Sequence, residues 1–200
     1  MKKSILTAIA FGLGAFVILV SCDRLFPGSG DFEPSGTAFL YNRNIELLSI
    51  TGKDRGFPKS GTFPLNITAQ SKSSGQESDI LPAGLLFRST RNQVQHMLLL
   101  KDRAITVNTS STQLELGTFC CNKYREIPRS PDTFEIGPVT DDTGLIEIID
   151  LVRERDISGT SNLWMIQHAV WMVTDSTGLT QAYRDSIEAL PQIQQNYPTF

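Results

Sequence analysis

Two thiols and one glutamine are the residues whose types and positions could support covalent chemistry. Cys120 and Cys121 are adjacent, and Cys22 is the only other cysteine among the 200 residues. A cysteine thiolate is a nucleophile, so an unpaired cysteine in a folded domain is a candidate for acyl transfer. Gln167 lies in an apolar stretch, where an unpaired amide would be costly to bury. These residues are the candidate site, and the elements that carry them decide whether they meet.

Gln167 lies in residues 161–175, which the residue pattern predicts to be a buried helix. Between Trp164 and Val173 only Gln167 and His168 are polar, and a helix that is apolar on nearly every side is normally buried. Trp164 and Trp171 are three residues before and four residues after Gln167. At helical spacing the three side chains share one face.

Cys120 and Cys121 end a predicted strand over residues 113–121. A disulfide between neighbouring cysteines is rare because a trans peptide sets their side chains apart. Two unpaired thiols are unusual in an oxidising compartment.

The first half of the chain is dominated by β-type runs. Residues 62–69 alternate, with Phe63, Leu65 and Ile67 on one face and Thr62 on the other. Residues 70–79 contain no apolar side chain and are typical of a solvated loop. The predicted strands cover residues 37–41, 45–50, 62–69, 85–89, 94–100, 104–107 and 113–121. Short strands separated by turns favour an antiparallel sandwich or barrel.

The second half has helical periodicity. Three prolines in residues 124–138 predict irregular structure there. A helix is expected to start at residues 141–143, with Asp141 and Asp142 as candidate caps, and residues 181–190 form the last predicted helix. The predicted fold class is α+β: an antiparallel β-sandwich-like N-terminal half followed by a three-helix C-terminal half. One domain covers residues 36–191, and residues 192–200 form a polar tail.

The N-terminus has the plan of a secretory signal. Lys2 and Lys3 precede an apolar run over residues 5–20, and residues 19–22, LVSC, resemble the bacterial lipobox. The resemblance implies that residues 1–21 are a signal peptide, that Cys22 is lipidated, and that residues 22–35 are a flexible tether. The protein would be exported and lipid-anchored in the bacterial cell envelope, and which membrane holds it stays open. The alternative is an uncleaved membrane anchor.

Composition excludes several classes of function. Removal of residues 1–21 changes the formal charge from −3 to −5, and no basic patch suits nucleic acid. Two histidines and no clustered carboxylates predict no metal site. No glycine-rich phosphate loop occurs, and no cofactor is expected.

Two short motifs resemble those of bacterial thioester domains. Residues 119–122, FCCN, are similar to the cysteine motif of that family, and residues 166–171, IQHAVW, are similar to its glutamine motif. The resemblance implies an internal thioester between Cys120 and Gln167, made with loss of ammonia, that can acylate an amine of a partner protein or surface. His168 would assist proton transfer, while Cys121 offers a competing thiol. Such a protein is not a turnover enzyme, because each molecule acylates at most one amine.

Two other classes of function stay open. In a non-covalent binding or envelope-structural lipoprotein, Gln167 would be a buried amide bonded to main chain. In an enzyme, Cys120 or Cys121 could form a protease site with His168 and Asp175.

Overall fold

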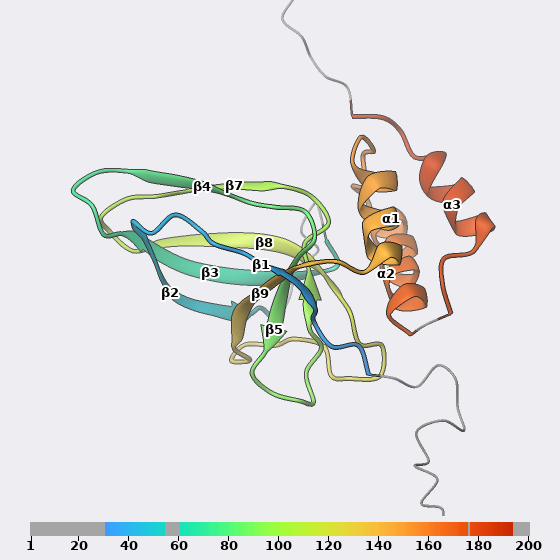
Figure 1. The fold of residues 1–200 in the computed structure, drawn as a ribbon, viewed down its shortest axis with the longest axis horizontal. Coiled ribbons are helices and arrows are strands. Elements are labelled where there is room, and N and C mark those ends of the chain that lie inside the picture. The colour runs from blue at the N-terminus through green and yellow to red at the C-terminus, as the bar shows by residue number, and fades with distance from the viewer. Residues whose placement is uncertain (1–30, 55–60, 176, 194–200) are drawn as a thin grey trace, which may run out of the picture.

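The computed structural model describes residues 31–54, 61–175 and 177–193. It confirms the predicted fold class: antiparallel β-structure is followed by three helices in one domain. The helices gather at one end of the β region (Figure 1). The predicted signal peptide, Cys22 and residues 194–200 lie outside the described residues.

One large antiparallel sheet forms most of the β region. Its strand order is β1-β9-β5-β6-β8-β3-β2. The strands are β1 (Gly36–Ala38), β2 (Ile45–Gly52), β3 (Phe63–Ser71), β5 (Leu85–Ser89), β6 (Met97–Leu98), β8 (Thr112–Cys120) and β9 (Phe134–Thr140). The sheet curls on itself, because Thr51 of β2 forms a bridge with Thr133 next to β9, and Gly52 N donates to Asp132 O at 2.9 Å.

A two-stranded hairpin packs against this curled sheet. It pairs β4 (Glu77–Leu81) with β7 (Arg103–Val107), and β7 contacts β3 and β8. Leu81, Ile105 and Val107 join the inward side chains of the large sheet in one apolar cluster, which we call the sheet core.

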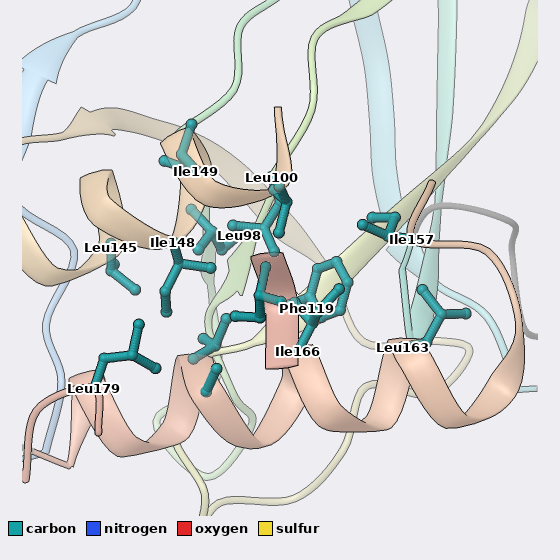
Figure 2. Close-up of a cluster of buried hydrophobic side chains, with 14 of the residues drawn as sticks. Leu98, Leu100, Phe119, Leu145, Ile148, Ile149, Ile157, Leu163, Ile166 and Leu179 are labelled. Atoms are coloured by element: carbon teal, nitrogen blue, oxygen red, sulfur yellow. The ribbon is translucent and has the colours of Figure 1, made fainter. Parts of the chain in front are cut away.

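The three helices are α1 (Thr143–Val152), α2 (Thr160–Thr174) and α3 (Gln181–Glu188). Helices α1 and α2 cover the other side of β5, β6 and β8, and α3 packs against α1 and α2. Leu98 and Phe119 pack with Ile148 and Ile166 in a second cluster, the helix core; Figure 2 shows α1 and α2 side chains converging on these strand residues. Asp142 caps α1 as the sequence predicts, since its side chain accepts from Leu145 N at 2.9 Å.

Central strands are therefore buried on both faces. Phe119 of β8 and Cys121, which directly follows the strand, belong to the helix core. Leu116 and Cys120 of β8 belong to the sheet core. Because neighbouring side chains of a strand point to opposite faces, a strand between two cores must be apolar at consecutive positions.

Two local predictions are wrong. Residues 134–138, the end of the segment expected to be irregular, belong to β9; Pro138 is tolerated because it falls at a register shift between β9 and β5. Residues 77–79, expected to be part of a solvated loop, belong to β4, which is stabilised by pairing with β7 and by Leu81 in the sheet core.

Residues 31–35, predicted to be part of the tether, are bound to the domain, and we call them the N-terminal strap. Asn122 Nδ2 donates to Asp31 Oδ1 at 3.0 Å and to Phe32 O at 2.8 Å, and Arg125 forms an ion pair with Asp31. Phe32 packs against the helix core. The described structure thus shortens the predicted tether at its C-terminal end.

Among the described residues, no helix combines the length and apolar character needed to cross a membrane.

Candidate functional site

The site lies where β8 ends between the two cores. Cys120 is the last residue of β8, and both Cys120 and Cys121 are fully buried and free. On one side Cys120 still pairs with Met97 of β6. On the other side its strand partner is missing, since the register of β3 begins with Phe63 opposite Thr118. The main-chain groups of Cys120 on that side need another partner.

Gln167 of α2 supplies that partner. Cys120 N donates to Gln167 Oε1 at 2.9 Å, and Gln167 Nε2 donates to Cys120 O at 2.7 Å. The carboxamide thereby replaces a β-strand residue and continues the ladder past the start of β3. Gln167 is fully buried, and both of its polar atoms are bonded. The structure therefore brings together the two residues that the sequence motifs single out, through the main chain of one and the side chain of the other.

Thr62 completes the environment of the carboxamide. Its Oγ1 donates to Gln167 Oε1 at 2.5 Å, so this oxygen accepts two hydrogen bonds. The same hydroxyl lies 3.5 Å from Thr118 O, a much longer contact. Contrary to the prediction that Thr62 is on the polar face of its strand, only 1% of its surface is exposed.

Gly61 explains how Thr62 comes so close to β8. A Cβ atom at residue 61 would lie 2.2 Å from Thr118 N, which is far inside contact distance. Only glycine allows this approach of the two main chains. Thr62 N then donates to Thr118 O at 2.9 Å, which fixes the threonine beside Gln167.

Both thiols are held in their neutral form. Burial, and secondarily the neighbouring Cys121, raises the pKa of the Cys120 thiol well above its usual range. Burial likewise raises the pKa of Cys121. A neutral thiol is a weak nucleophile, so chemistry at Cys120 must depend on proximity and on activation of the group it attacks.

The two cysteines are not equivalent. Cys120 belongs to the sheet core and carries the main-chain groups bonded to Gln167, whereas Cys121 belongs to the helix core. Cys121 N is bonded to His96 O at 2.9 Å instead. Of the two cysteines, Cys120 is thus the one whose main chain contacts the Gln167 carboxamide.

Aromatic rings of α2 contact one another and β3 near Gln167 in the sequence. Trp164 and Trp171 have ring centroids 6.5 Å apart, and Trp164 meets Phe63 of β3 edge to face at 6.1 Å. His168 is exposed, and its ring lies 5.6 Å from that of Trp171 and 6.3 Å from that of Trp164. The contacts of His168 are therefore with the tryptophans, and none is found to Cys120 or Gln167 among the described residues.

A second buried glutamine, which the sequence motifs do not indicate, supports the same region. Gln95 Oε1 accepts from Asn122 N and from Trp171 Nε1, each at 3.2 Å, and Gln95 Nε2 donates to Arg125 O at 3.2 Å. It joins Trp171 of α2 to the chain just after the cysteines. Neither Gln95 nor Thr62 has a sequence signal, because their partners are distant in the chain.

The described structure does not join the histidine and the aspartate of the protease alternative. Asp175 N is bonded to Trp171 O, and no hydrogen bond joins Asp175 to His168 in the described part of the chain. Over those same residues, no three metal-ligating side chains gather. Cys22, the predicted lipidation site, lies outside the described residues.

The comparisons give no family for this chain: no family model, no curated protein and no solved structure matches it.

Proposed function

We propose that this protein is an exported lipoprotein whose domain forms an internal thioester between Cys120 and Gln167 and uses it to acylate an amine of a partner surface. The observation that carries the proposal is the pair of hydrogen bonds, at 2.9 and 2.7 Å, between the Gln167 carboxamide and the main chain of Cys120. Two motifs 47 residues apart thus meet in the fold.

The proposed reaction balances without a cofactor. The Cys120 sulfur adds to the side-chain carbonyl carbon of Gln167, the thiol proton passes to the amide nitrogen, and ammonia leaves. A partner amine later attacks the same carbon, the sulfur leaves as a thiol, and an amide joins the partner to residue 167. Each molecule reacts once, so the protein stores an acyl group and does not turn over.

Burial supports the storage step. Cys120 and Gln167 have no exposed surface. Exclusion of water protects a reactive acyl group from hydrolysis. The predicted lipid on Cys22 would keep the domain at a membrane surface, where a covalent bond to a partner serves attachment.

Intact mass tests the thioester directly. A soluble form that begins at residue 23 is expected to weigh one ammonia less than its sequence requires, and methylamine should add its own mass to this product. Cys120→Ala and Gln167→Ala should each show the full mass of their sequences and no methylamine adduct, whereas Cys121→Ala should behave like the wild type. A full wild-type mass that methylamine leaves unchanged would refute the proposal.

A second function is favoured by the same contacts. Both ends of the Gln167 amide are used by main-chain groups, and the Cys120 side chain packs in the sheet core. These features also suit a non-covalent binding or envelope-structural lipoprotein in which Gln167 only joins α2 to β8. The full wild-type mass described above is the result expected for this function.

A further inference from the structure

The carbonyl oxygen of Gln167 accepts hydrogen bonds from two fixed donors, a main-chain N–H and a side-chain hydroxyl. Cys120 N donates to Oε1 at 2.9 Å and Thr62 Oγ1 donates to the same atom at 2.5 Å. Two donors aimed at one carbonyl oxygen draw electron density from its carbon and make that carbon a better electrophile.

The same two donors match the charge that acyl transfer creates. When sulfur or an amine adds to the carbonyl carbon, negative charge develops on Oε1 in the tetrahedral intermediate. Fixed donors in a site without water stabilise this charge without having to reorganise. Thr62, Cys120 and Gln167 are each at most 1% exposed, so no water competes for these hydrogen bonds.

We propose that Thr62 is a catalytic residue, whose hydroxyl forms with the main-chain N–H of Cys120 an oxyanion hole for making and opening the Cys120–Gln167 thioester. This inference rests on the proposed function. It adds a residue that lies outside both the cysteine motif and the glutamine motif. Thr62 is 105 residues before Gln167 in the chain.

The fold positions this hydroxyl independently of the hydrogen bond it makes to Gln167. Thr62 N is bonded to Thr118 O, and the close approach of Gly61 to β8 fixes the main chain. The hydroxyl can therefore be removed while its main chain stays in place, and Thr62→Val, which keeps the side-chain shape, is the informative substitution.

Aminolysis kinetics of the purified full chain test the inference. Thr62→Val is expected to slow methylamine incorporation by between about 10²- and 10³-fold, the range found when one oxyanion donor is lost. Thr62→Ser, which restores the hydroxyl, should recover most of the rate. Thr68→Val makes the same change on β3 away from the site and should react like the wild type.

The outcomes separate the two proposals. If the wild type lacks one ammonia and Thr62→Val reacts as fast, the role of Thr62 is refuted while the thioester stands. If Thr62→Ser is as slow as Thr62→Val, the hydroxyl is not responsible, and the role of Thr62 is again refuted. This comparison also holds if Thr62→Val folds poorly, because the serine variant must still react quickly. A wild type of full mass refutes both proposals.

Discussion

At the scale of single residues, Gln167 is a buried amide that binds both main-chain polar groups of Cys120. Its carboxamide closes a gap in the hydrogen-bond ladder of β8, which no other side chain of the described structure fills at Cys120. Removal of a partner leaves a buried donor or acceptor unsatisfied, at a cost of about 1–3 kcal/mol for each group. Gln167 therefore contributes to stability whether or not the thioester forms.

We expect Gln167→Ala to lower the free energy of unfolding by about 2–4 kcal/mol, because Cys120 N and Cys120 O both lose a buried partner. Urea-induced unfolding measures this loss. Gln181→Ala, on the exposed side of α3, is the matched control and should change stability by no more than about 0.5 kcal/mol. Equal effects of the two substitutions would contradict the assigned role of Gln167.

At the scale of elements, the end of β5 is bonded to the unprotonated form of one buried histidine, His96. Ser89 N donates to His96 Nδ1 at 3.0 Å, which requires an unprotonated ring nitrogen. Burial, and then the positive charge of Arg125, lowers the pKa of His96. Arg88 acts in the same direction, while Glu33 and Asp31 of the strap partly oppose it.

Stability should therefore fall as the pH is lowered through about 6.5, the ordinary pKa of histidine. The unfolded chain takes up this proton at a higher pH than the folded chain does, so the stabilising difference is complete only above that value. Thermal midpoints at several pH values between 7.5 and 5 measure the effect. Carboxylates such as Asp31, whose pKa is lowered by its hydrogen bond to Arg125, act only at more acidic pH.

His96→Asn tests the origin of this pH dependence, because its side-chain oxygen can accept from Ser89 N without titrating. The variant should lose most of the dependence between pH 7.5 and 5. His168→Asn, which changes the exposed histidine, should keep it. A wild-type slope that survives in His96→Asn would assign the effect to other groups.

At the scale of the whole molecule, the proposed lipid and the proposed thioester lie at separate cysteines. Cys22 follows the predicted signal peptide, while Cys120 and Cys121 are buried in the domain. Lipid attachment and acylation chemistry are therefore expected to be independent.

Metabolic labelling with palmitate in a bacterial host tests the anchor. Cys22→Ser should abolish the label and release the protein from the membrane fraction, because no lipidated residue remains. Cys120→Ala should retain both the label and the membrane location. Label that persists in Cys22→Ser would contradict the lipobox interpretation.

Local patterns were sufficient for much of the fold. Apolar spacing predicts α1 and α2, and consecutive apolar residues agree with strands buried on both faces. The pairing of the strands could not be predicted from such local patterns. The first three residues of β4 are polar and belong to a strand because they pair with β7, and β9 contains Pro138 at a register shift that depends on β5.

Residue type and periodicity are local properties, and they were enough to indicate Cys120 and Gln167 and the strand and helix that carry them. The contact of the Gln167 carboxamide with the Cys120 main chain, and the hydrogen bond from Thr62 to the same oxygen, depend on tertiary packing. These contacts join residues 47 and 105 positions apart. Their geometry follows from the end of β3, the close approach at Gly61 and the packing of α2, none of which has a local signature.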